Sequence, residues 1–401
     1  MALQSAKNVT VAFKPESTFY DLPGDASAEF LRFTPSPGLQ ETAADIRSNE
    51  QRADALTTMG RSGSRQVSGS YGGECSLRSH DTLYEAVVRG TWSTELALTN
   101  ATSNAPATIT TEANAIVGAD NSFITVGLRA GDVIRLSGFA TAANNDRNLR
   151  VTAVTATRIE TVETLVVDSN ADAAYTITRG KKLVNPAAPV KRSFGVEQNN
   201  VDIAGSQFYS GVRFTGFSIS GSPDGMATVE FSAIGAGLRT FTGSESPYFT
   251  TPTVYNSVPL VFADAKIAVR GSDVINITAF ELSYAINAAT EPVVGTVRSP
   301  DVFDNDASVE GSLTRIREDF DNVEDFVNET EFSLHVLLTE PVAEPKPYIA
   351  FYVPRCKYTD ASAPLGGDGA MKESLPFQVG AQTASAGVDA TMISICTSAA
   401  V

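Results

Sequence analysis

Apolar and polar residues alternate in short runs along the whole chain, and this period of two is the feature that most constrains the fold. Successive side chains of a strand point to opposite faces, so each run predicts a strand that is buried on one side. Glycine, serine, asparagine and aspartate clusters separate the runs, at spacings typical of antiparallel sandwiches and barrels. A mainly β chain is therefore predicted. The clearest runs are Val9-Val11-Phe13, Phe194-Val196, Val212-Phe214, Phe217-Ile219, Phe280-Leu282-Tyr284 and Phe332-Leu334-Val336.

Two segments instead have the periodicity of a short amphipathic helix. The first runs from Thr82 to Val88, with Leu83, Tyr84, Val87 and Val88 on one stripe. The second runs from Asp319 to Val327, with Phe320, Val323, Phe326 and Val327 on one stripe. Asp321 followed by Glu324 fits a capping box, which predicts Asp321 as the N-cap of the second helix.

The two helices have matching surroundings, which predicts an internal duplication. Val67-Ser68-Gly69-Ser70 precedes the first helix and Val309-Glu310-Gly311-Ser312 precedes the second. Further upstream, Ile46-Arg47-Ser48 matches Val297-Arg298-Ser299. Downstream, residues 224–236 and 368–381 share Asp-Gly, Met, Phe and Gly-Ala in the same order. The chain is therefore expected to hold two copies of one β domain with a short helix in each.

An inserted domain is expected to interrupt the first copy, because a further strand pattern with its own turn signals follows the first helix. Six short strands are predicted there, as a small barrel or sandwich, and Phe123-Ile124-Val126 and Leu165-Val166-Val167 are two of them. Leu183 to Val190, with two prolines, is predicted to be an extended return linker. The expected division is 1–104 (first domain, first part), 105–182 (inserted small β domain), 183–245 (first domain, second part) and 246–401 (second domain).

The composition favours a soluble globular chain of more than one domain, with 401 residues, 42% of them apolar and 19% charged. Asp and Glu outnumber Lys and Arg by 46 to 30, which gives a formal charge of -16. Such a chain repels nucleic acid, so a gene regulator is excluded. Neither a secretion signal nor a membrane span is expected.

Residue types that carry enzymatic chemistry are scarce. His80 and His335 are the only histidines, and each is interpreted as structural. Cys75, Cys356 and Cys396 are spaced too widely for a zinc site and are expected to be buried thiols. The acidic run Arg317–Asp325 lacks the glycine of a calcium loop and is interpreted as a solvated helix face, and Gly60–Arg65 as a flexible loop. We expect no catalytic, metal or cofactor site and no enzymatic activity.

The order of these motifs resembles the tail tube proteins of long-tailed, siphovirus-like bacteriophages. The resemblance rests on Ile46-Arg47-Ser48, Val67-Ser68-Gly69-Ser70, the helix ending near Gly90-Thr91, Phe214-Thr215-Gly216-Phe217, and the similar motifs of the second half up to Gly366-Gly367-Asp368-Gly369. It covers most of residues 10–245 and 255–395 and excludes the insertion. It implies a β-sandwich or partial barrel with a flanking helix, whose sheets join between subunits into a tube for the genome.

The resemblance also implies partners and a place in the virion. Six domains usually form a ring, so a duplicated chain implies trimeric, pseudo-hexameric rings that stack, with a hexamer as the alternative. A tape measure protein, a tail terminator and a distal tail protein are implied as partners, and viral DNA passes through the lumen without specific binding. Assembly is expected in the host cytoplasm, and the insertion is expected to project outward as decoration or to stiffen the tube.

Contacts between stacked rings are expected in the loop of residues 49–64 and in its shorter counterpart, residues 300–306. The candidate contact residues are Asn49, Arg52, Arg61, Arg65, Pro300 and Asp304. Two alternatives remain open. One is another tube or capsid-decoration component, and the other is a carbohydrate-binding or hydrolytic β-sandwich of a phage fibre.

Overall fold

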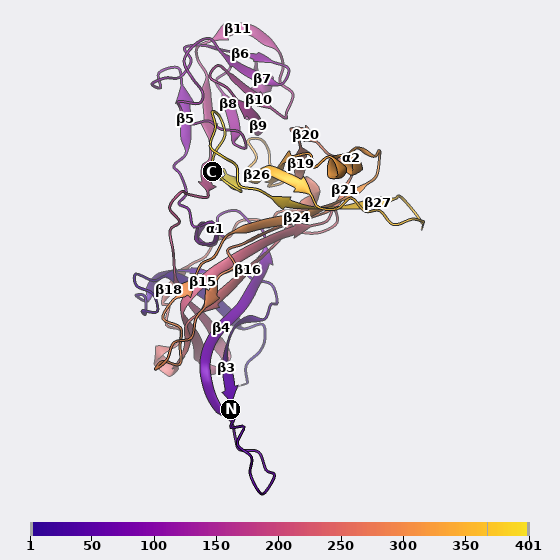
Figure 1. The fold of residues 1–401 in the computed structure, drawn as a ribbon. Helices are drawn as coiled ribbons and strands as arrows, with labels where there is room; N and C mark the ends of the chain where they lie inside the picture. Colours follow the sequence, from indigo (N-terminus) through magenta and orange to yellow (C-terminus); the bar gives the residue numbers. More distant parts are fainter. Residues whose placement is uncertain (1–2, 367, 399–401) are drawn as a thin grey trace.

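A computed structural model describes residues 3–366 and 368–398 of the chain. Strands dominate it, which confirms the mainly β prediction, and its helices α1 (Asp81–Val88) and α2 (Asp321–Val327) lie where two helices were predicted. Figure 1 shows an elongated molecule in which one domain stands apart from a long central sheet, and an extended hairpin projects at the opposite end.

The first copy of the repeat forms around a central antiparallel order of β3, β4, β16 and β15. On the other side of β15, β14 pairs with the first half of that strand, and β1 pairs with β14. Its strands are β1 (Val9–Pro15), β2 (Ala26–Phe30), β3 (Gly38–Ile46), β4 (Arg61–Glu74), β14 (Phe194–Asn200), β15 (Gly205–Gly221), β16 (Thr228–Gly235) and β17 (Gly237–Thr242).

The second copy repeats this pairing pattern strand for strand. β21, β24, β27 and β26 pair in the same order, β25 lies beside β26, and β19 beside β25. Even the register shift between Phe194 and Val196 recurs, between Phe332 and Leu334. The strands are β19 (Lys266–Val269), β20 (Ser272–Asp273), β21 (Ile277–Ala285), β24 (Ser308–Ile316), β25 (Phe332–Thr339), β26 (Tyr348–Tyr358), β27 (Lys372–Val379) and β28 (Ser394–Thr397).

The two copies join through the second half of β15. Residues Gly216–Gly221 of this strand pair with Phe280–Ala285 of β21, in antiparallel register. The first half of β15 pairs instead with β14 and β17. One sheet therefore runs without a break from β3 in the first copy to β26 in the second.

A single apolar core underlies both copies, and α1 lies at its centre. Tyr84 of α1 contacts the rings of Phe217 and Phe231 in the first copy, with ring centroids 5.2 and 5.3 Å apart. The same ring lies 5.9 Å from Phe351 of the second copy. Edge-to-face packing of this kind adds to the stabilisation from area burial. α1 therefore holds the two copies together as well as flanking its own sheet.

The apolar stripe of α2, by contrast, faces solvent. Phe320 and Val327 are 66% and 69% exposed, and Phe326 is exposed as well. α2 is held by polar contacts, since Asn322 donates to the Glu373 carboxylate at 2.6 Å and Asp325 pairs with Arg270. The predicted capping box is wrong. The N-cap residue is Phe320, one residue before Asp321, and its side chain makes no capping hydrogen bond. The Asp319 carboxylate accepts the Asp321 N–H at 3.1 Å, which places Asp321 in the first turn of the helix.

A separate eight-stranded sheet with its own core forms the inserted domain. Its first strand starts at Leu96, before the expected boundary at 105. Residues 123–127 form a turn in which Phe123 is buried and Thr125 exposed, and residues 164–167 are irregular, so two of the predicted strands are wrong. The Val166 N–H bonds the Asn144 side chain instead of a neighbouring strand. The strands are β5 (Leu96–Thr99), β6 (Ile109–Glu112), β7 (Ala115–Gly118), β8 (Val133–Ser137), β9 (Leu149–Val154), β10 (Arg158–Thr161), β11 (Asp168–Asp172) and β12 (Thr176–Arg179).

The inserted domain interrupts the sequence of the first copy, but it packs against the second copy. Val133 packs with Leu337 of β25 and Tyr348 of β26, and the Tyr348 hydroxyl donates to the Val133 carbonyl at 3.0 Å. β13 (Lys181–Val184) then pairs with β28, so the predicted return linker begins as a strand. The domain is thereby fixed against the second copy.

Buried ion pairs reinforce this docking. Lys182, which is almost fully buried, lies 2.5 Å from the Asp132 carboxylate of the inserted domain and 2.6 Å from the Asp389 carboxylate of the second copy. The fully buried Arg150 likewise bridges Glu163, at 2.7 Å, and Asp273 of β20. Loss of either member of such a buried pair is strongly destabilising, because the remaining member is then left charged and unpaired away from water.

Replacement of Lys182 by methionine should therefore lower the free energy of unfolding by about 3 kcal/mol, since the buried Asp132 carboxylate then keeps only the more distant Arg179 guanidinium, 3.5 Å away. The neighbouring Lys181 is exposed, and Lys181→Met should cost less than about 0.5 kcal/mol. Urea unfolding followed by circular dichroism compares the two variants. Equal midpoints for both would contradict a stabilising role for the buried pair.

Candidate assembly surfaces

The continuous sheet ends in two strand edges that lack a partner strand within the described residues. At one end, β3 pairs with β4 alone. At the other end, the chain continues beyond β26 as the segment Thr359–Leu365. It follows β27 through the Thr359 N–H, which donates to the Pro376 carbonyl at 2.9 Å, and through a bridge between Ser362 and Ser374. Open edges of this kind are templates for pairing with another chain.

A hairpin ribbon formed by the second half of β3 and the first half of β4 projects from the body (Figure 1). Two-stranded ribbons are marginally stable alone in water, which favours a partner that covers this one. The ribbon and its loop also expose Ile46, Leu56 and Met59, with Met59 95% exposed. Exposed apolar residues that cluster on one projection indicate a contact surface.

Four of the predicted contact residues lie on this hairpin. Asn49 is exposed in the loop, and Arg52 pairs with Asp54 at 2.6 Å beside it. Arg61 and Arg65 are strand residues, so the flexible loop predicted over Gly60–Arg65 is wrong. Both arginines belong to β4 because they pair with Ile46 and Ala43 of β3. The role of all four in contacts between rings stays a prediction.

The counterpart loop in the second copy packs on the first copy of the same chain. Arg298 lies over the Tyr20 ring, 5.4 Å from its centroid, and 3.7 Å from the Glu41 carboxylate. Asp301 pairs with Arg213 at 2.7 Å. The contacts of Arg298 and Asp301 with the first copy were not predicted, although the Val297-Arg298-Ser299 motif had identified the segment as part of the repeat.

The remaining two predicted contact residues lie in this counterpart loop. Pro300 is exposed. The Asp304 carboxylate is 5% exposed and lies 3.7 Å from both Arg89 and Arg213, so it is already engaged within the chain. For these residues too, a role between rings stays a prediction.

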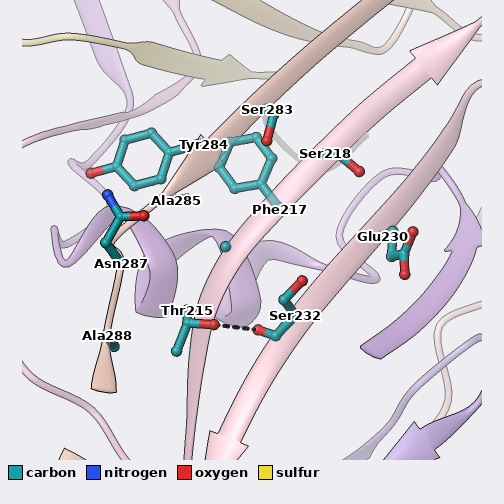
Figure 2. A pocket seen from close by; sticks show the side chains of 11 residues that line it. Thr215, Phe217, Ser218, Glu230, Ser232, Ser283, Tyr284, Ala285, Asn287 and Ala288 are labelled. Carbon is teal, nitrogen blue, oxygen red and sulfur yellow. Dashed lines mark hydrogen bonds between the residues drawn. The ribbon is translucent and has the colours of Figure 1, made fainter. Parts of the chain in front are cut away.

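One face of the central sheet is covered by the core, and the other is polar. Strand pairing aligns Glu230, Ser218, Ser283 and Glu310 in one row across β16, β15, β21 and β24. Figure 2 shows Ser218, Glu230, Ser232 and Ser283 around a shallow pocket on this face. Alternation also places Ser232, Ser312 and Thr314 on this face, and brings Ile234 and Ile316 to its ends. Arg213 pairs opposite Ile234 and Lys372 of β27 opposite Ile316, so the face is polar and its central row is acidic.

Both histidines and all three cysteines are buried. Burial lowers the pKa of the His80 imidazole to about 4 and that of His335 well below its usual value. The three cysteines are buried and free, and burial raises the pKa of the Cys75 thiol to about 12.

Among residues 3–366 and 368–398, no group of three or more His, Cys, Asp or Glu side chains is placed to hold a metal. Likewise, no helix in that part of the chain is long and apolar enough to cross a membrane.

His80 gives a test of how closely α1 is sealed in the core, where the imidazole stacks on Phe231 with ring centroids 5.5 Å apart. Its pKa in the folded chain lies below the unfolded value, so stability is lost as the pH falls from about 6.5 towards 4. By pH 5 this loss amounts to about 2 kcal/mol.

The His80→Phe variant removes the titration and keeps an aromatic ring. Its free energy of unfolding should therefore change between pH 7 and pH 5 by about 2 kcal/mol less than that of the unmodified chain. Urea unfolding at the two pH values measures the difference, and the buried carboxyl groups contribute equally to both proteins. An identical pH dependence would mean that the His80 imidazole has the same pKa in the folded and the unfolded chain.

Comparison with models of protein families gives one match, whose description is phage tail tube protein, over residues 6–379. Among curated proteins, none matches the chain.

Proposed function

We propose a ring of three chains for this protein, which belongs to the phage tail tube protein family and is therefore a structural component of the phage tail. The tube is the conduit through which the genome leaves the virion. The observation that carries the trimer is the repeated pairing pattern, because each chain supplies two equivalent domains to the wall. Three such chains provide six domains in pseudo-hexameric order.

The polar face of the central sheet is proposed to line the bore. Its row of Glu230, Ser218, Ser283 and Glu310 presents carboxylates between small hydroxyls. Carboxylates repel DNA phosphates, and this row offers them no lysine or arginine as a counterion. Viral DNA would then slide past without specific binding. The opposite, apolar face is not available for this role, since it is buried against α1 and the core.

The β3–β4 hairpin is proposed to connect stacked rings. It projects beyond the rest of the body and exposes Ile46, Leu56 and Met59. Its loop would order against the neighbouring ring, in line with the family resemblance. Asn49, Arg52, Arg61 and Arg65 would then be contact residues, as predicted.

The inserted domain is proposed to lie outside the tube and to stiffen it. It docks on β25, β26 and β28 of the second copy, away from the polar face of the sheet. A domain that leaves one copy and is fixed by ion pairs to the other braces the angle between them. Assembly in the host cytoplasm with a tape measure protein, a terminator and a distal tail protein completes the proposal, and no enzymatic role is part of it.

Electron microscopy of the purified chain, with its mass measured by light scattering, tests the ring. Rings or tubes with a central hole and a mass of three chains per ring are expected. A ring of six chains would contradict the trimer and leave the tube role standing. A monomer that binds glycans and never assembles would instead support the fibre-module alternative.

The hairpin makes a separate prediction about stacking. The double variant Leu56→Ser and Met59→Ser should fold normally, because both side chains are exposed, and should form rings that stack into much shorter tubes. Val167→Ser on the inserted domain, where the side chain is similarly exposed to that of Leu56, serves as the control and should leave tube length unchanged. Tubes of normal length from the double variant would rule out an apolar stacking contact at this loop.

A further inference from the structure

We propose that neighbouring chains join by antiparallel pairing of Thr359–Leu365 in one chain with the open edge of β3 in the next. This junction would reproduce, residue for residue, the pairing of β15 with β21 inside each chain. The inference rests on the proposed ring and adds to it the two edges and their register. Its basis is that the chain already contains one junction of the required kind.

The first step is the equivalence of β3 and β21. In the first copy, Leu39 of β3 pairs with Gly69 of β4, which pairs in turn with Ala233 of β16. In the second copy, Leu282 of β21 pairs with Gly311 of β24, which pairs with Phe377 of β27. Leu39 and Leu282 therefore occupy the same position in the repeat. It follows that Gln40 corresponds to Ser283.

The second step is the equivalence of Thr359–Leu365 and the second half of β15. Phe214 of β15 pairs with Ala233, and Tyr358 of β26 pairs with the equivalent Phe377. Further along, Ser218 pairs with Glu230, while Ser362 forms its bridge with Ser374. Ser362 thus corresponds to Ser218.

The register follows from these two equivalences. Inside the chain, Ser218 pairs with Ser283. Between chains, Ser362 should therefore pair with Gln40 of the next copy. Gln40 lies at the β3 end of the sheet and Ser362 at the β27 end, so the two residues cannot meet within one chain.

The edge at Ser362 has its backbone groups oriented for this pairing. Ser362 and Ser374 exchange two backbone hydrogen bonds, of 3.3 and 2.8 Å, so the backbone of Ser362 points towards β27. Alternation then directs Ala361 and Ala363 outward. Pro364 shares the orientation of Ser362, so its missing N–H removes no outward donor.

In the single chain, side chains form hydrogen bonds with backbone groups at both open edges, β3 and Thr359–Leu365. The Asp360 carboxylate accepts the Ala361 N–H at 2.8 Å, and the Gln198 amide donates to the Leu39 carbonyl at 3.5 Å. Both bonds involve groups that would pair across the junction. Exchanging them for strand pairing keeps every backbone group satisfied, while the Asp360 charge discourages pairing with unrelated edges.

A disulfide at the proposed pair tests the register. Residues directly opposite in antiparallel strands have Cα atoms about 4.5–5.5 Å apart, within reach of a disulfide. The double variant Gln40→Cys and Ser362→Cys, oxidised after assembly, should convert most of the protein into covalent dimers and trimers on a non-reducing gel. The native cysteines are buried and do not compete.

Two matched variants define the outcomes. Ser218→Cys with Ser283→Cys should form the same bond within one chain, and Thr42→Cys with Ser362→Cys, which is out of register, should link far less. Rings that contain no Gln40→Cys to Ser362→Cys link, while the control within one chain does link, would overturn the junction and leave the tube role intact. Absence of rings from the unmodified chain would overturn the proposed ring itself.

Discussion

Pairing between strand edges joins the two copies of the repeat and sets where further copies can attach. β15 is long enough to pair with β14 and β17 over its first half and with β16 and β21 over its second, and this makes two copies into one sheet. The same arrangement leaves β3 and Thr359–Leu365 as unpaired edges. A sheet that is satisfied internally and open at both ends is suited to closing into a ring with further copies.

The two copies have the same strand topology and differ in how their helices pack. Tyr84 in α1 is buried between rings of both copies, whereas α2 is fixed by Asn322 and exposes Phe320. The inserted domain adds a brace through Lys182, which pairs with a carboxylate on each side of the contact. One chain therefore holds two equivalent domains in a fixed relation to each other.

Local patterns in the sequence predicted much of this fold. Period-two alternation located β1, β14, β15, β21 and β25, and the recurrence of Val-x-Gly-Ser before each helix pointed to the repeat. These patterns failed where a tertiary contact determines the local secondary structure. Asn144 holds Val166 out of a strand, and pairing with β3 makes Arg61 a strand residue. The row that contains Glu230 and Glu310 could not be predicted, because it depends on the register between strands far apart in the sequence. The same holds for the open edge at Ser362.

Reconstruction of assembled tubes by electron cryomicroscopy would show how neighbouring chains join. Six similar domains from three chains are expected in each ring, with β-sheet running unbroken across every chain boundary and Ser362 opposite Gln40 of the next chain. The in-chain and between-chain junctions should then superpose. Rings of six chains, or chain boundaries bridged by loops and side chains with the edge of β3 left unpaired, would contradict this arrangement.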